Sequence, residues 1–229
     1  FSSDATTQNG LSEPRAISYD PSNQRLFVAD RDNNRVLVYD LSEGMSNGMN
    51  ASAIIGAPDF TTVPDCSTPD STTSCNPVAL EYDQESGRLF VSDTDHNRIM
   101  VYNIPDSLDS IDGSFTASHV LGASDFTTAG SGSPTVNSFS SVEDLTLGDS
   151  QDLYVEDGSN GRILMFDVNE ITNAILNILD NCILDDIDVK KLSMFDIEYL
   201  FLRLRAKSVG EVIELKLGHQ DSDCTHVLD

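Results

Sequence analysis

The chain has 229 residues, and its 38 Asp and Glu against 13 Lys and Arg give a formal net charge of −25 at pH 7. A chain this acidic repels phosphate groups, so its composition excludes a protein that binds nucleic acid or an anionic membrane surface. No apolar run approaches the roughly 20 residues of a membrane-spanning helix, so we expect no membrane partner.

One sequence pattern occurs three times. Its copies run from Leu26 to Asp40, from Leu89 to Asn103 and, less regularly, from Leu153 to Asp167. The arginine of the pattern recurs after 63 and then 64 residues. A constant period of this size indicates structural units that stack or arrange radially, each too small to bury its apolar face alone.

Each unit is predicted to form four short strands. The runs are β-branched or aromatic, and clusters of Asp, Asn, Gly and Pro separate them. In the first unit we expect strands at Ala16–Tyr19, Leu26–Ala29, Val36–Tyr39 and Ala53–Gly56. A four-stranded antiparallel sheet repeated at constant spacing is a propeller blade.

The core of the pattern, Asp-x-x-Asn-x-Arg, resembles the NHL repeat family of β-propellers over about residues 11–168. The resemblance is weaker in the third repeat, where Gly161 replaces the Asn before the arginine. It implies a mainly β fold, a partial propeller of about 2.75 four-stranded blades, whereas closed propellers have roughly four to eight. The rest of the ring is then missing, or other chains supply it, or the blades stack openly.

Two cysteines lie in a Ser/Thr-rich loop between the first two repeats. Cys66 and Cys75 are nine residues apart with no histidine near them in the sequence. This arrangement predicts a local disulfide, and with it an oxidising compartment, extracellular or virion-associated. Two free thiols in a reducing cytoplasm are the alternative.

The composition changes near residue 170. Residues 1–173 contain seven Arg and no Lys, whereas residues 174–229 contain four Lys and two Arg. The fourth strand of the third unit is replaced by a helical period at 174–179, so we predict two domains, 1–170 and 171–229. In the second, Ser193 begins a capped helix, a strand follows at 211–217, and 218–221 form a turn, which together make a small α/β segment.

The run from Phe195 to Glu211 resembles the baseplate-protein family of T-even-type myophages, which includes hub subunits and hub assembly chaperones. The resemblance covers about residues 180–229. It implies that the helix docks into an assembly through its apolar side chains, namely Phe195, Tyr199, Leu200, Phe201 and Leu204. The two families do not ordinarily share a chain, so a sequence joined from two unrelated sources is a third reading beside a natural or deliberate fusion.

The charged residues of the repeat are candidates for chemistry. They are Asp30, Asp93 and Asp157 with Arg35, Arg98 and Arg162. One active site does not need the same pair in every unit, so their recurrence predicts structural ion pairs in which the aspartate also accepts turn amides.

Metal sites are not favoured by the remaining residues. His96 is expected in a solvent-exposed turn. Calcium held by Asp30, Asp32 and Asn34 is a minor alternative, because no glycine follows to shape such a loop. A zinc site would have to come from Cys182, His219, Cys224 and His226, whose spacings lack a Cys-x-x-Cys knuckle. No cofactor is predicted.

These observations predict a non-enzymatic binding or structural protein with protein partners or self-assembly. The alternative is a fragment of a secreted metal-dependent propeller hydrolase or lyase, since several relatives of the NHL family depend on a metal. For an incomplete ring we expect the apolar blade faces to be covered by other subunits or by the C-terminal segment. The side chains concerned are Phe27, Val38, Phe90, Val101, Tyr154 and Met165.

Overall fold

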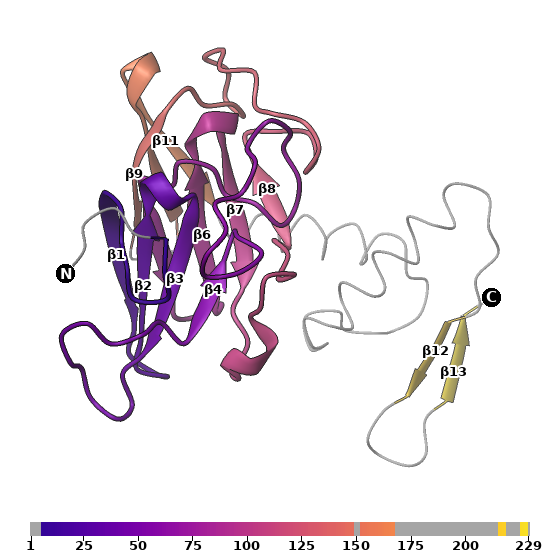
Figure 1. The fold of residues 1–229 in the computed structure, drawn as a ribbon. Coiled ribbons are helices and arrows are strands. Elements are labelled where there is room, and N and C mark those ends of the chain that lie inside the picture. The colour runs from indigo at the N-terminus through magenta and orange to yellow at the C-terminus, as the bar shows by residue number, and fades with distance from the viewer. Residues whose placement is uncertain (1–5, 149–151, 168–214, 219–224, 229) are drawn as a thin grey trace. The chain divides into compact units, whose positions relative to one another are not determined.

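A computed structural model describes residues 6–148, 152–167, 215–218 and 225–228. The chain divides into two compact units, Phe1–Phe166 and Asp167–Asp229. In the described residues the secondary structure is β-strand with short 3-10 turns, so the predicted mainly β fold is confirmed (Figure 1). None of the described helices is long and apolar enough to cross a membrane.

The first two repeats each form a four-stranded antiparallel sheet, with the strands in sequence order. Blade 1 consists of β1 (Pro14–Asp20), β2 (Arg25–Asp30), β3 (Arg35–Asp40) and β4 (Ala53–Ile55). Blade 2 consists of β5 (Leu80–Asp83), β6 (Arg88–Asp93), β7 (Arg98–Asn103) and β8 (His119–Leu121). In blade 1, β1, β2 and β3 are two or three residues longer than predicted, because flanking residues continue the ladder, as Pro14 does opposite Asp30, whereas β4 is one residue shorter.

The third repeat forms blade 3, in which three antiparallel strands are described. They are β9 (Val142–Leu147), β10 (Asp152–Asp157) and β11 (Arg162–Asp167). A separate hairpin of β12 (Leu215–Gly218) and β13 (Thr225–Leu228) belongs to the second unit. Gly218 therefore ends a strand instead of opening the predicted turn. The predicted helix lies outside the described residues.

The blades pack face to face, with β1 beside β5 and β5 beside β9. Phe27 and Val38 of blade 1 share one apolar core with Leu89 and Tyr102 of blade 2. Phe27 stacks on Tyr82 with ring centroids 5.3 Å apart.

This packing corrects one expectation. Phe27 and Val38 are covered by blade 2 of the same chain, and Phe90 and Val101 are also buried, so none of the four needs another subunit. Met165, in contrast, is 60% exposed on blade 3.

Candidate functional site

Each blade places one aspartate and one arginine at the same point of its sheet. The aspartate ends the second strand, a 3-10 turn follows, and the arginine begins the third strand; the turns are η1 (Arg31–Asn33), η2 (Thr94–His96) and η4 (Gly158–Asn160). The residue before the arginine has positive φ, 50° at Asn34, 52° at Asn97 and 61° at Gly161. Asparagine and glycine adopt this conformation at least cost, which explains why glycine can replace asparagine in the third repeat.

The aspartate and arginine of each blade form an ion pair within that blade. The Nε–Oδ2 distances are 2.6 Å in Asp30–Arg35, 2.7 Å in Asp93–Arg98 and 2.7 Å in Asp157–Arg162. The first two pairs are fully buried, whereas the side chain of Arg162 is 26% exposed. The three pairs therefore do not converge on one site.

The same groups also hold the loops that lead into each blade. In blade 2, the backbone N–H of Cys75 donates to Asp93 Oδ1 at 3.0 Å. Arg98 Nη1 donates to the carbonyl of Phe126 at 2.6 Å, and Nη2 donates to that of Asp70 at 2.8 Å. Blades 1 and 3 repeat this arrangement, with Ser12 and Ser140 as the amide donors. The charged residues thus fasten loops to sheets and have internal partners.

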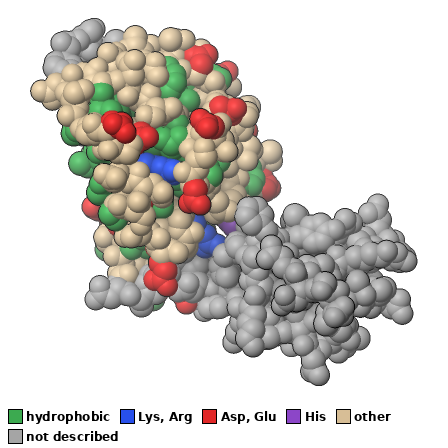
Figure 2. Space-filling view, turned by 90° about the horizontal axis from the view of Figure 1, so that it is seen from below, with side chains coloured by type: hydrophobic (Ala, Val, Ile, Leu, Met, Phe, Trp, Pro, Cys, Tyr) green, Lys and Arg blue, Asp and Glu red, His purple; other side chains and the backbone are tan. Residues whose placement is uncertain are grey.

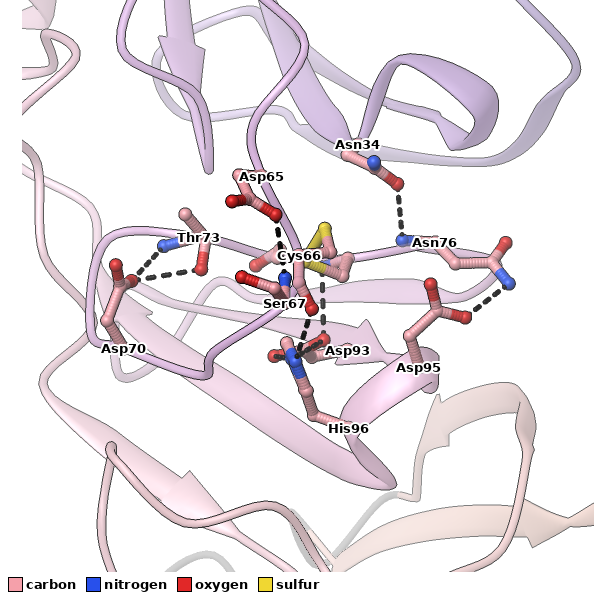
Figure 3. The surroundings of a disulfide bond; sticks show 12 residues. Asn34, Asp65, Cys66, Ser67, Asp70, Thr73, Asn76, Asp93, Asp95 and His96 are labelled. Atoms are coloured by element: carbon pink, nitrogen blue, oxygen red, sulfur yellow. Dashed lines mark hydrogen bonds and ion pairs between the residues drawn. A yellow bond between two sulfur atoms is a disulfide. The ribbon is translucent and has the colours of Figure 1, made fainter.

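The predicted disulfide joins Cys66 and Cys75, with an S–S distance of 1.98 Å and Cα atoms 5.9 Å apart. Cys75 is fully buried. Figure 3 shows the disulfide directly beside Asp93 and His96, with Asn34 of blade 1 bonded to Asn76, the residue after the bridge. The bridge therefore closes a loop whose ends are attached to blade 2 and which contacts blade 1.

His96 is buried, with 6% of its surface exposed, so the expectation of an exposed turn histidine was wrong. Its Nδ1 lies 2.9 Å from Asp93 Oδ1 and its Nε2 lies 3.1 Å from the carbonyl oxygen of Cys66 (Figure 3). Both partners are acceptors, so the imidazolium, which has two donors, satisfies both. The hydrogen bond to Asp93 raises the pKa of His96, and burial opposes the rise.

The role of His96 could have been inferred from the residues at the same position in the other two repeats. At the positions equivalent to His96, Asn33 Nδ2 donates to Asp30 at 2.8 Å and Asn160 Nδ2 donates to Asp157 at 2.9 Å. Histidine therefore occupies a donor position of the network. In blade 2 alone, this donor titrates.

We expect the stabilising effect of His96 to disappear as the pH rises. The pKa of His96 in the folded protein is raised above the ordinary value of about 6.5. The contribution of His96 to the free energy of unfolding is therefore fully present below about pH 6.5, and it is lost as the pH rises through the pKa of the folded state. The thermal midpoint of wild type minus that of His96→Asn should therefore fall with increasing pH between about pH 6 and 8. A pH-independent difference between wild type and His96→Asn would contradict the prediction.

The group of candidate metal ligands in the described residues differs from the calcium and zinc sets that the sequence suggested. Cys75, Asp93 and His96 have ligand atoms within 4.8 Å of one another, but the sulfur of Cys75 is in the disulfide and is no free thiolate. In the calcium alternative, Asp30 accepts from Arg35 and Asn34 Oδ1 accepts from the N–H of Asn76. Of the zinc alternative, Cys182, His219 and Cys224 lie outside the described residues.

A polar pocket of about 410 Å³ lies where the three blades meet, and Arg15, Arg31 and Glu143 are among its lining residues. Glu13 forms ion pairs with both arginines, at 3.1 Å with Arg15. On the face shown in Figure 2, acidic side chains are spread over the surface and basic ones show only in small patches. The pocket therefore has little positive charge free to hold an anion.

Two families match parts of the chain. Residues 11–39 match the NHL repeat, and residues 144–229 match the T4 bacteriophage base plate protein. The chain thus carries both types of segment that the sequence resembled. The second match begins within β9, before the boundary that composition predicts. No curated protein matches the chain.

Several solved structures are similar at low identity. Hydrazine synthase of Kuenenia stuttgartiensis has 9% identity and a TM-score of 0.38, covering 71% of this chain and 37% of its own. Sqt1 of Saccharomyces cerevisiae has 13% identity and a TM-score of 0.37, covering 64% and 29%. Virginiamycin B lyase of Staphylococcus aureus has 15% identity and a TM-score of 0.34, covering 68% and 41%. The chain therefore spans less than half the length of these proteins.

Proposed function

We propose that this protein is a non-enzymatic binding and assembly protein, whose propeller loops contact a protein partner and whose C-terminal segment attaches it to a phage-particle-like structure. The observation that carries the proposal is the match of residues 144–229 to a base plate protein in a chain whose first unit is built of NHL-type blades. The buried Asp–Arg pairs support it, because they hold loops in place and are not gathered at one site.

The loops after the fourth strands are suited to contact a partner. Asp59 Oδ1 accepts from the backbone N–H groups of Thr61 and Thr62 at 2.7 and 2.8 Å, and Asp125 repeats the turn with Thr127. Hydrogen bonds from Thr61, side chain and backbone, lower the pKa of Asp59 to about 2. These turns are therefore ordered before binding and remain negatively charged, which favours a partner with a basic surface.

The assembly role can be tested on purified particles of a T4-type tailed phage. We expect a tagged full-length chain to co-sediment with purified particles, and Tyr199→Asp/Leu200→Asp to remove most of it, because charges would enter the apolar face of the predicted helix. The matched control is Glu43→Gln, on an exposed loop, which should be retained like wild type.

Two results would contradict the proposal. One is equal retention of the helix variant and wild type on the particles. The other is hydrolysis or lyase turnover of ester or lactone substrates by the purified chain with added divalent metal, which would favour the enzyme alternative.

A further inference from the structure

The outer faces of blades 1 and 3 both expose large apolar side chains. On blade 1, Ile17 is 69% exposed and Tyr19 is 47% exposed. On blade 3, Ile163 is 63% exposed and Met165 is 60% exposed. Side chains of this size gathered on a sheet face mark an interaction surface.

The open face of blade 1 is continuous across its strands. Ile17 lies opposite Val28, and Tyr19 lies opposite Leu26, which lies opposite Tyr39. Residues directly opposite each other in an antiparallel ladder point to the same face. A mainly apolar cavity of about 460 Å³ adjoins this face, between Leu26, Tyr39 and the loop with Met45.

Blade 2 shows what such a face binds. A shift of 63 residues brings Ile17 onto Leu80, Tyr19 onto Tyr82, and Leu26 onto Leu89. In blade 2 these residues pack against blade 1, where Leu80 is 4% exposed and Leu89 is fully buried. The natural partner of this type of face is the opposite face of another blade.

Blade 3 presents that opposite face. Blade 1 covers blade 2 with an apolar set that includes Phe27, Val36 and Val38. Tyr154, Ile163 and Met165 occupy the equivalent positions of blade 3. Among the described blades, the face of blade 3 that corresponds to the covering face of blade 1 is therefore open at one end of the array, and the face of blade 1 that corresponds to the covered face of blade 2 is open at the other.

The open faces of blades 1 and 3 differ in one respect from the faces that meet between blades 1 and 2. Each open face carries a charged residue in place of an apolar one, and the two charges are opposite. Glu156 of blade 3 stands where blade 1 has Ala29, and Arg15 of blade 1 stands where blade 2 has Val78. Both lie at the end of the sheet that carries the 3-10 turns, since Pro14 pairs with Asp30 in the ladder. Each charge is uncommon at a blade contact. Arg15 forms an exposed ion pair with Glu13 of its own blade at 3.1 Å, and Glu156 would add a second carboxylate to that pair.

We propose that the open face of blade 1 binds blade 3 of a second copy of this chain, head to tail. Tyr154 of one copy would stack on Tyr19 of the other, as Phe27 stacks on Tyr82, and Glu156 would pair with Arg15. The described residues of two copies supply six blades, which is within the roughly four to eight of closed propellers, so a head-to-tail contact between these faces is of the type that can close a ring. This inference goes beyond the proposed function and does not depend on it.

Sedimentation equilibrium of the full chain tests the contact. We expect a dimer, which Tyr19→Asp converts to monomer while the circular dichroism spectrum is kept. Val136→Asp is the matched control, because Val136 is 77% exposed but lies outside both faces, and it should remain dimeric.

Charge reversal tests the orientation. Arg15→Glu and Glu156→Arg should each raise the dimer Kd by about tenfold. A mixture of the two variants should associate more tightly than either variant alone. In the mixed dimer, the glutamate at position 15 of one copy faces the arginine at position 156 of the other, so the two positions again carry opposite charges. A folded wild-type monomer at every concentration, or a mixture no tighter than its components, overturns the inference; a monomer that still sediments with particles would leave the proposed function standing.

Discussion

Replacing Asp93 by asparagine is expected to lower the free energy of unfolding by about 3–5 kcal/mol. The side chain of Asp93 is fully buried and accepts hydrogen bonds from Arg98 and from the backbone N–H of Cys75. Asparagine keeps the shape but leaves the Arg98 guanidinium, which is also fully buried, without its counter-charge. Uncompensated buried charges are among the most destabilising changes known.

The third blade contains the matched control for this prediction. Asp157 makes the corresponding contacts, with Asn160 in the place of His96, but water reaches the side chain of Arg162, which is 26% exposed. Asp157→Asn should therefore cost clearly less than Asp93→Asn, and Asp30→Asn should cost about as much as Asp93→Asn. Urea unfolding followed by far-ultraviolet circular dichroism measures all three, and the chain has no tryptophan for a fluorescence probe. Equal losses at Asp30 and Asp157, where an asparagine donates to the aspartate in both blades, would show that burial of the arginine is not the cause.

A paired substitution separates the ion pair from simple loss of packing. Asp93→Leu/Arg98→Met removes both charges and fills the site with apolar atoms, so we expect it to be more stable than Asp93→Asn. A double variant that is less stable than the single one would mean that the lost hydrogen bonds dominate, namely those of Arg98 to the loop carbonyls and those that Asp93 accepts from Cys75 and His96.

Removing the disulfide is expected to cost about 2–4 kcal/mol. In Cys66→Ala/Cys75→Ala the unfolded chain gains freedom, and the folded chain loses the tether between the loop and blade 2. The residues at both ends of the tether belong to the Asp93 network, because Cys75 N–H donates to Asp93 and the Cys66 carbonyl lies at His96. Urea unfolding of the variant, with and without reductant, measures the loss.

The disulfide and His96 should be coupled. In the alanine variant the carbonyl of Cys66 is no longer held beside His96, so His96→Asn should cost less there than in wild type. Reductant should destabilise wild type but leave the stability of the alanine variant unchanged. Additive effects of the two changes would mean that the loop keeps its position without the bridge.

The repeat period determined the blades from the sequence alone. Short β-branched or aromatic runs such as Leu26–Ala29 and the turn residues between them are local signals, so they predicted strands β1–β4 to within three residues. The recurrence of the Asp and Arg positions likewise indicated a structural role, and the spacing of Cys66 and Cys75 predicted their disulfide. These features depend on residues close together in the chain.

Contacts between distant residues were decided only by the tertiary structure. His96 reads as a polar turn residue until the loop that carries Cys66, 30 residues earlier, folds over it and supplies an acceptor. The apolar faces of the blades look alike in sequence, yet Leu89 is buried and the equivalent Leu26 lines a cavity, because blade 1 covers blade 2 and no described blade covers blade 1. Burial depends on which sheets meet, and a residue's own neighbours in the sequence carry no record of that.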